Sequence, residues 1–366
     1  MSRPQSIPSE TSQTPDRPCT KRRKVLCAAV LALAVLAGVA AVAGLRLHHM
    51  MFGPGVTLPE GASVPLYIEE DETYPALYGR LTEAGYLRYP RVFDWMAGRM
   101  RYKDRVRAGR YMLSQGMSNR RLLQMLRAGE QAPVEVTFRP FRFAEQLAGA
   151  VTKPLQCDSA ELVVLLRDET YLAEFGVTPS TVLTLFIPDT YQFMWNTSAD
   201  GFVRRMFREY NRFWEGKREE AREKLGMTRT EVAILASIVE EETHRAEDRR
   251  MVARVYLNRL ARRMPLQADP TVRYALGDFT IRRVLTEHLS IPSPYNTYYV
   301  NGLPPGPICI PSAESIDAVL YAPQHDYLYF CTAPDFESLN FARTLREHNR
   351  NAAAYQRELN RLKIWR

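Results

Sequence analysis

Three consecutive carboxylates, Glu240-Glu241-Glu242, are the residues of this chain best suited by type and place to acid–base chemistry. A carboxylic acid whose pKa is raised by its surroundings can hold a proton near neutral pH and donate it as a general acid. The three follow an apolar run, and Thr228 with Glu231 three residues later forms the capping-box pattern that predicts a helix start. A solvated helix end would have the same pattern, so the residues alone leave both interpretations open.

The faces of the predicted helix separate the glutamates. A projection at about 100° per residue places Glu240 on a side of small residues, Ala233, Ala236 and Ser237. Small side chains leave room for a substrate, so Glu240 is the candidate general acid. Glu242 projects from the apolar stripe instead. It could equally be a buried carboxyl paired with an arginine from Arg249, Arg250 or Arg254.

Two later segments carry polar and aromatic side chains that suit a sugar, which needs both apolar stacking and hydroxyl partners. One segment alternates polar with apolar residues, so an extended backbone would place its polar members on one face. The other is a polar–aromatic loop. Turn formation alone would also explain both segments. The candidate contacts are Gln267, Asp269, Thr271, Tyr295, Asn296 and Tyr298.

Composition excludes several other classes of protein. The six histidines lack HExxH or any other metal-ligand spacing, so no metal and no other cofactor is predicted. The formal charge is +8, but six basic and two acidic residues precede residue 25, so half of it lies in a short tail. The remaining charge is spread thinly, which does not predict nucleic-acid binding. Five cysteines in 366 residues are too few for a disulfide scaffold.

The N-terminal region predicts a membrane anchor. Residues 25–45 contain no charge, and about 20 apolar residues can cross a bilayer as a helix. Basic residues 21–24 precede this span, so the positive-inside rule places the N-terminus in the cytoplasm and the bulk outside. A cleaved leader or a buried helix of a soluble core are the alternatives. Residues 1–24 are predicted to be a disordered cytoplasmic tail, and residues 46–59 a linker.

The remaining chain is predicted to be α+β, with two domains. Residues 60–135 read as a small β-α-α-β module, with strands at 64–68 and 108–113 around two short helices. Such a small unit without a titratable cluster suits binding or spacing better than catalysis. Residues 136–366 read as a larger, mixed α/β domain that contains all the candidate site residues.

Eight segments carry motifs in a fixed order: PDTYQF (188–193), LASIVEEET (235–243), VARVYLNRL (252–260), MPLQADPTVRYALG (264–277), SPYNTY (293–298), GLPPGPI (302–308), YLYF (327–330) and EHN (347–349). Together, and behind a membrane span, they resemble the endolytic murein transglycosylase family (MltG/YceG-like). One departure is that Ser338-Leu339-Asn340-Phe341 stands where family members often carry a Gly-x-His-x-Phe stretch. A histidine role at that place is therefore not expected.

The resemblance implies a single-pass protein of the bacterial inner membrane with its bulk in the periplasm. The small module would be LysM-like. The enzyme would cut peptidoglycan glycan strands between N-acetylmuramic acid and N-acetylglucosamine, leave 1,6-anhydro ends and so limit strand elongation. Penicillin-binding proteins or other cell-wall synthases would be its partners. The family's catalytic glutamate matches the first Glu of IVEEET, which is Glu240, with Glu242 and the six residues above as sugar contacts or supports of the acid.

Two alternatives stay open from the sequence. One is a hydrolase of the same glycan, in which Asp269 or Glu242 supplies the second carboxyl that hydrolysis generally needs. The other is a non-catalytic peptidoglycan-binding scaffold that recruits synthases, although a scaffold would not need the acid in LASIVEEET.

Overall fold

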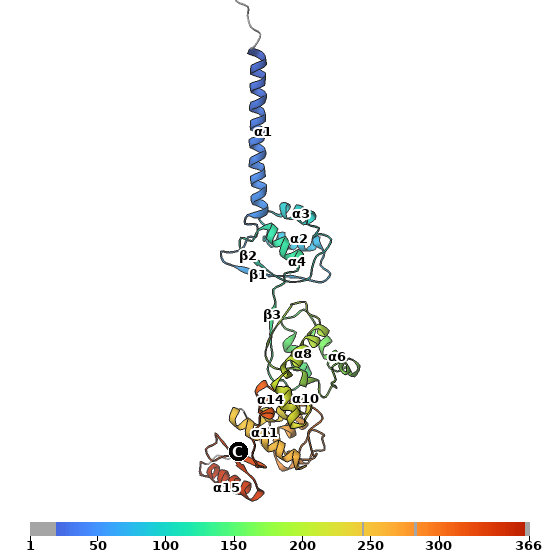
Figure 1. Ribbon diagram of the computed structural model, residues 1–366, viewed down its shortest axis with the longest axis vertical. Helices are drawn as coiled ribbons and strands as arrows, with labels where there is room; N and C mark the ends of the chain where they lie inside the picture. Colours follow the sequence, from blue (N-terminus) through green and yellow to red (C-terminus); the bar gives the residue numbers. More distant parts are fainter. Residues whose placement is uncertain (1–19, 244, 282–283, 363–366) are drawn as a thin grey trace, which may run out of the picture. The chain divides into compact units, whose positions relative to one another are not determined.

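The structure is a computed structural model that describes residues 20–243, 245–281 and 284–362. Residues 1–19 of the predicted tail lie outside these ranges. The chain forms two compact units, Met1–Gln131 and Ala132–Arg366. Both units mix helices and strands (Figure 1), as predicted, and each is described by itself.

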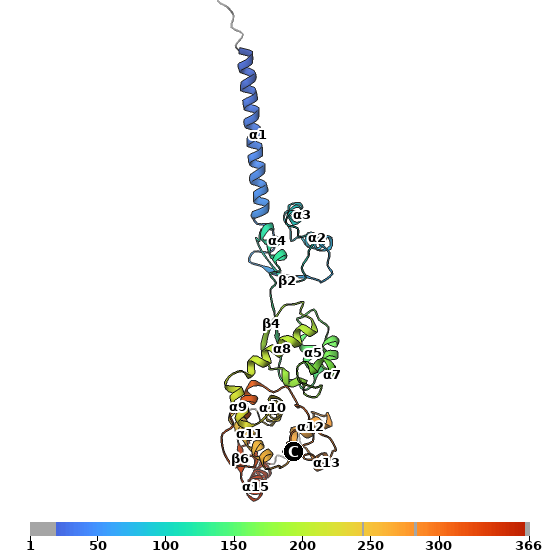
Figure 2. The same cartoon turned by 45° about the vertical axis from the view of Figure 1, so that its right-hand side comes forward.

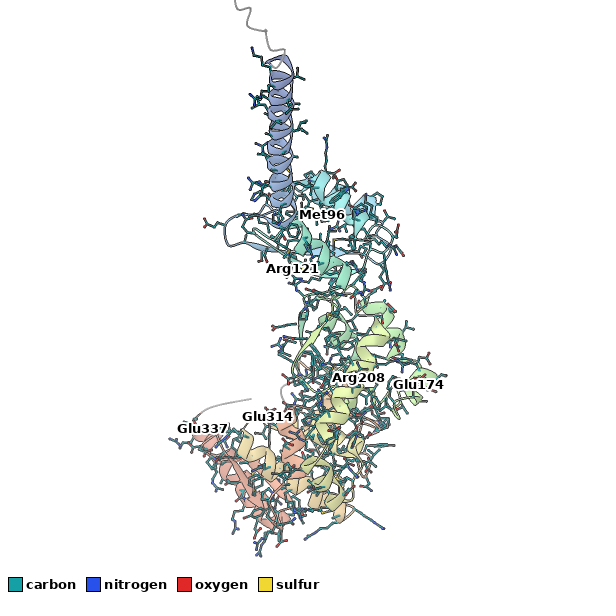
Figure 3. All side chains as sticks on the ribbon, turned by 45° about the horizontal axis from the view of Figure 1, so that its top comes forward. Met96, Arg121, Glu174, Arg208, Glu314 and Glu337 are labelled. Atoms are coloured by element: carbon teal, nitrogen blue, oxygen red, sulfur yellow. The ribbon has the colours of Figure 1, made fainter. Side chains whose placement is uncertain are left out.

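The first unit begins with a long apolar helix. Its stretch Arg23–Phe52 is long and apolar enough to cross a membrane. Side chains along this helix stand free of the rest of the unit (Figure 3). The helix runs on through part of the predicted linker, and beyond it Val56 is buried in the core of the module. Residues 46–59 are therefore not an unstructured linker, because the first of them complete α1 and Val56 packs in the core of the module.

A small module follows in the predicted strand–helix–helix–strand order. The two strands are antiparallel, with Ser63 opposite Ser114 and Ile68 opposite Gly109. A further helix is capped by Ser118 and ends at Gly129, whose φ of 73° is the left-handed conformation that glycine adopts readily. The elements are α1 (Thr20–Phe52), β1 (Ser63–Ile68), α2 (Tyr74–Glu83), α3 (Pro90–Arg99), β2 (Gly109–Ser114) and α4 (Asn119–Ala128).

The second unit is mostly helical, with two small antiparallel sheets, β3–β4 and β5–β6. Its first half comprises β3 (Val134–Thr137), α5 (Ala144–Val151), α6 (Ser159–Leu165), α7 (Glu169–Ala173), η1 (Val182–Leu185), β4 (Thr190–Phe193), α8 (Ala199–Trp214) and α9 (Lys217–Leu225). Its second half comprises α10 (Arg229–Glu242), α11 (Ala246–Ala261), α12 (Asp269–Leu276), α13 (Thr286–Leu289), α14 (Ala313–Leu320), β5 (Tyr329–Thr332), β6 (Leu339–Ala342) and α15 (Leu345–Arg361).

Helix α10 is the centre of the second unit and packs against α11, α12 and α14 (Figures 1 and 2). The predicted capping box is confirmed: the Glu231 backbone N–H donates to Thr228 Oγ1 at 3.1 Å, and Thr228 N–H donates to Glu231 Oε2 at 2.7 Å. Every residue from 232 to 239 is buried. The helix therefore delivers its C-terminal glutamates from a fully packed core.

The small-residue side of α10 does not face open space. Ala233, Ala236 and Ser237 are all buried. The Ile308 backbone N–H donates to Ser237 Oγ at 3.0 Å, so a later segment of the chain covers this side. The expectation that a substrate approaches along these residues is wrong, because the protein itself fills the room that they leave.

Candidate active site

Glu242 ends α10 beside a buried tyrosine of α11. The Tyr256 hydroxyl donates to Glu242 Oε1 at 2.6 Å. Tyr256 is 1% exposed and meets Phe330 edge to face, with ring centroids 5.9 Å apart. A buried phenol held by an aromatic neighbour has little freedom to turn away. It therefore fixes the orientation of one carboxyl oxygen of Glu242.

The surroundings of Glu242 make it a proton-exchanging group near neutral pH. The pKa of its carboxyl is raised from 4.5 to about 7, chiefly by burial and also by the charge of Asp269. The Tyr256 hydrogen bond and the charges of Arg273 and Arg259 lower it and only partly offset burial. A carboxyl with a pKa of about 7 exists in both protonation states at neutral pH, as a group that serves as acid and then as base requires.

Glu240 is engaged differently. The Ser312 backbone N–H donates to Glu240 Oε2 at 3.1 Å, and the Ser312 hydroxyl donates to the same oxygen. Arg249 lies 3.5 Å from Oε1. Ser312 also caps α14, so Glu240 connects the end of α10 to the start of α14 and to α11. Both of its oxygens have protein donors, which suits a structural role.

Glu241 holds the end of α10 to an earlier segment. Arg142 Nη2 lies 2.8 Å and 2.6 Å from its two carboxyl oxygens. The same guanidinium lies over the Phe279 ring at 4.6 Å. The three consecutive glutamates thus have three different environments, and only Glu242 has a tyrosine hydroxyl as its described donor.

Asp269 is the second carboxyl near Glu242. It accepts a hydrogen bond from the Tyr298 hydroxyl at 2.7 Å, and its charge raises the pKa of Glu242. Burial, followed by Asp269, also raises the pKa of Tyr298. Two of the predicted contact residues therefore lie together near Glu242, one from the start of α12 and one from the loop after α13.

Gln267 and Tyr295 also belong to this part of the unit. Gln267 is exposed, its φ is 52°, and its Oε1 lies 3.5 Å from Arg259 Nη1. Tyr295 is half-buried against Tyr274, with ring centroids 4.8 Å apart. The predicted extended segment is wrong beyond residue 268, because α12 begins at Asp269 and ends the alternation of faces. The roles of Gln267 and Tyr295 at sugars stay predictions.

Thr271 and Asn296 are held by hydrogen bonds within the protein. Thr271 is fully buried, and its hydroxyl donates to the Ala268 carbonyl at 2.6 Å. Asn296 is also fully buried, with its amide donating to the carbonyls of Leu289 and Ile291 at 3.0 and 2.9 Å. The Thr271 hydroxyl also lies 2.8 Å from the Thr297 hydroxyl, so the polar atoms of both residues are engaged by the protein. A role of Thr271 and Asn296 at sugars stays a prediction.

The sequence analysis missed Tyr256 and Arg259. Arg259 is 7% exposed and donates to the carbonyls of Leu328 and Leu266 at 2.6 and 2.7 Å. Tyr256 and Arg259 lie three residues apart in α11, and both are buried. The sequence did contain a signal for them, because a polar side chain on the inward face of a helix needs a buried hydrogen-bond partner.

No group of three His, Cys, Asp or Glu residues suited to a metal ion occurs in the described part of the chain. The arrangement offers instead a carboxyl of nearly neutral pKa, a tyrosine that orients it, a second carboxyl and a buried arginine. Such a set can perform acid–base chemistry with side chains alone.

Comparisons with known proteins identify the family of this chain. The YceG-like family matches residues 66–354. An endolytic murein transglycosylase of Bacillus subtilis is 30% identical over 82% of this chain and 84% of its own length. One of Streptococcus pneumoniae is 29% identical, and the match covers 58% of its length. The crystal structure of a YceG-like protein from Listeria monocytogenes is 28% identical with a TM-score of 0.51, covering 79% of this chain and 98% of that one. The chain therefore belongs to the YceG-like family.

Proposed function

We propose that this chain is an endolytic murein transglycosylase. It cleaves the bond between N-acetylmuramic acid and N-acetylglucosamine inside peptidoglycan strands and leaves 1,6-anhydro ends, which limits strand elongation. The observation that carries the proposal is Glu242, whose buried carboxyl has a pKa of about 7 and a fixed tyrosine donor. The relatives named endolytic murein transglycosylase support the same reaction.

In the proposed mechanism Glu242 is the single acid/base. Its protonated form donates to the glycosidic oxygen as the bond to the muramic residue breaks. The resulting carboxylate then takes the proton from the C6 hydroxyl of that residue as its oxygen closes the ring. The hydroxyl belongs to the substrate, so its high effective concentration replaces an activated water. Tyr256 occupies Oε1, while Oε2 has no donor among the described residues and can serve the substrate.

This proposal moves the acid from Glu240 to Glu242. The resemblance assigned the family's catalytic glutamate to Glu240, the first Glu of IVEEET. The proposal departs from that assignment because Ile308 covers Ser237 on the small-residue side of α10 and because both oxygens of Glu240 have protein donors. We assign Glu240 to positioning α10 against α14. Asp269 and Tyr298 are proposed as contacts of the sugar or supports of Glu242, and Gln267 and Tyr295 as sugar contacts.

A hydrolase is the second candidate, because one observation favours it. Asp269 lies close enough to Glu242 for its charge to raise the pKa of that carboxyl. Two neighbouring carboxyls are the usual requirement for hydrolysis, with one as acid and the other as base or nucleophile. In that case water, and not the C6 hydroxyl, would end the reaction.

The proposed cellular location of the protein follows from features of the first unit. Helix α1 is proposed to be the single-pass anchor. The basic residues 21–24 at its start favour an N-terminus in the cytoplasm and a second unit in the periplasm. The module after α1 is proposed to be LysM-like. Nascent strands made by penicillin-binding proteins or other synthases at the membrane would be the substrate within reach.

The test uses the full-length chain in a non-ionic detergent with uncrosslinked glycan strands, and resolves the products by mass. Fragments about 18 Da lighter than hydrolysis products would carry anhydro ends and support the lytic reaction. Hydrated ends would establish the hydrolase. Strands that bind but stay intact would establish the scaffold, which the sequence left open.

A further inference from the structure

The module of the first unit is divided by charge. Residues 88–130 contain eleven basic and three acidic residues, whereas residues 53–87 contain one basic and six acidic residues. The basic part forms α3, β2 and α4. Of these, α3 and α4 contact α1, and the Asn119 amide at the start of α4 donates to the Met50 carbonyl at 3.1 Å. The positive charge of the module therefore collects at the end of the apolar helix.

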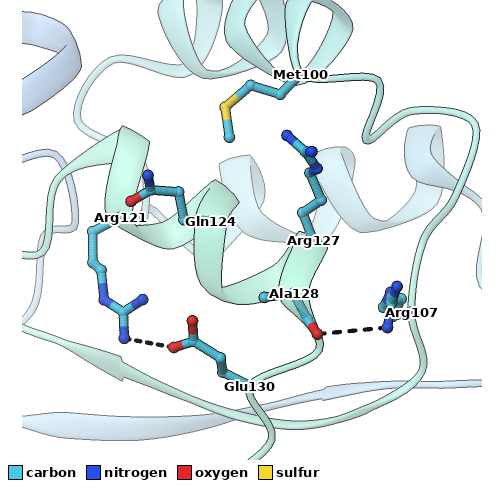
Figure 4. A pocket seen from close by; sticks show the side chains of 7 residues that line it. All are labelled: Met100, Arg107, Arg121, Gln124, Arg127, Ala128 and Glu130. Atoms are coloured by element: carbon cyan, nitrogen blue, oxygen red, sulfur yellow. Dashed lines mark hydrogen bonds and ion pairs between the residues drawn. The ribbon is translucent and has the colours of Figure 1, made fainter.

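Two cavities lie in this basic part and share two residues of α4 and the residue that follows α3. The larger, of about 580 Å³, is lined by Arg107, Arg121, Arg127 and Glu130, among others (Figure 4). The smaller, of about 380 Å³, is lined by Phe52 of α1 and by Trp95 and three arginines. Met100, Gln124 and Arg127 line both cavities, which makes them neighbours.

Most of the arginines that line these cavities form no ion pair with a carboxylate of the described residues. Arg121 pairs with Glu130 at 2.6 Å, and Arg107 reaches only the Ala128 carbonyl at 3.5 Å (Figure 4). Three further exposed guanidinium groups have no ion pair among the described residues: Arg99, Arg120 and Arg127. Unpaired arginines in a cavity suit an anion, because the guanidinium fork matches a phosphate.

The smaller cavity combines this charge with exposed aromatic surface. Trp95 is 53% exposed and Phe52 is 40% exposed. The Arg120 guanidinium lies over the Phe52 ring at 5.0 Å. Exposed aromatic rings and arginines together are typical of the membrane–water interface, where one part of the ligand is apolar and the other charged.

The length of α1 brings these cavities to the height of lipid headgroups. The stretch Arg23–Phe52 has 30 residues. At 1.5 Å per residue such a helix is about 45 Å long, close to the ~40–45 Å of a bilayer with its headgroups. Phe52, which lines the smaller cavity, is thus expected to emerge among the headgroups.

We propose that the two cavities bind the phosphate headgroup of an anionic phospholipid beside α1. Arg99, Arg120 and Arg127 bind the phosphate, while Phe52 and Trp95 contact the glycerol and upper acyl chain. The bound lipid holds the module against the membrane surface. The inference rests on α1 as a membrane anchor, and it is independent of the reaction catalysed by the second unit.

The test uses the full-length chain in mild detergent with equal amounts of phosphatidylglycerol and phosphatidylcholine, and counts retained lipids by native mass spectrometry. We expect phosphatidylglycerol to be retained about tenfold over phosphatidylcholine. The preference should disappear when Arg99→Gln, Arg120→Gln and Arg127→Gln are combined. A matched control combines Arg91→Gln, Arg101→Gln and Arg105→Gln, which are exposed, lose the same charge and line neither cavity.

The control variant should keep the preference, and hydrogen exchange in β1 and β2 should be unchanged in both variants if the module stays folded. Equal loss in both variants would overturn the proposal in favour of general charge attraction. Displacement of the lipid by millimolar inorganic phosphate would reassign the cavities to a free anion. Displacement by soluble glycan strands would reassign them to the glycan. Loss of glycan cleavage with intact lipid binding would refute only the proposed reaction.

Discussion

The Glu242→Gln variant is expected to be more stable than the wild type at alkaline pH, although it loses the proposed acid. Glutamine keeps an oxygen that can accept the Tyr256 hydrogen bond, so the geometry of the site is preserved. What the substitution removes is the charge that burial disfavours. A gain in stability with a loss of function is typical of residues whose environment is arranged for chemistry.

The size and sign follow from the pKa. Burial raises the pKa of Glu242 from 4.5 to about 7, and each pKa unit corresponds to about 1.36 kcal/mol. The side chain keeps some exposed surface, so we expect about 1–3 kcal/mol instead of the full ~3.4 kcal/mol. The folded state binds this proton more tightly than the unfolded state. The wild type therefore loses stability as the pH rises from 4.5 to about 7, while the variant does not.

The assay is hydrogen exchange in α10 of the full-length chain at pH 5 and pH 8.5, read as the free energy of opening. The gain in the free energy of opening of Glu242→Gln over the wild type should be small at pH 5 and reach its full size at pH 8.5. Glu240→Gln is the control, because it removes an ion pair with Arg249 and should lower stability. Equal stability of Glu242→Gln and wild type at both pH values would refute the buried-charge argument.

Three further predictions concern the surroundings of the acid. Tyr256→Phe removes the hydrogen bond that lowers the pKa of Glu242, so the alkaline limb of the pH–rate profile should move upward; an unmoved limb would contradict this role. Asn296→Ala leaves two backbone carbonyls without donors and should cost about 1–3 kcal/mol with little change in KM; a raised KM at normal stability would favour Asn296 as a sugar contact. Arg259→Lys cannot keep both hydrogen bonds to backbone carbonyls, so the free energy of opening of α11 should fall by about 1–3 kcal/mol. Hydrogen exchange in α11 at the wild-type rate would contradict this prediction.

Local signals in the sequence predicted the elements well. The capping box at Thr228 and the apolar runs of strands 64–68 and 108–113 each involve only a few neighbouring residues, so no distant partner is needed to reveal them. The antiparallel pairing of these two strands was not predicted, because it joins segments that are far apart in the sequence. The end of α1 and the packing of Val56 were missed, because glycines and prolines in that segment suggested a linker.

The site depends on contacts between distant segments, which periodicity cannot give. The helical projection placed Glu240 beside small residues correctly, but it could not show that Ile308, 71 residues from Ser237, covers them. It also placed Glu242 in the apolar stripe, where a buried arginine partner was one of the alternatives. The partner is Tyr256, while Arg249 binds Glu240.

The most direct test of the central claim compares Glu242→Gln with Glu240→Gln on uncrosslinked glycan strands, after hydrogen exchange has shown both variants to be folded. The account predicts that Glu242→Gln releases no anhydro products at any pH. It predicts that Glu240→Gln still releases them, at a rate lowered only by its weaker packing against α14. Anhydro products from Glu242→Gln, with none from a folded Glu240→Gln, would contradict the account and return the acid to Glu240.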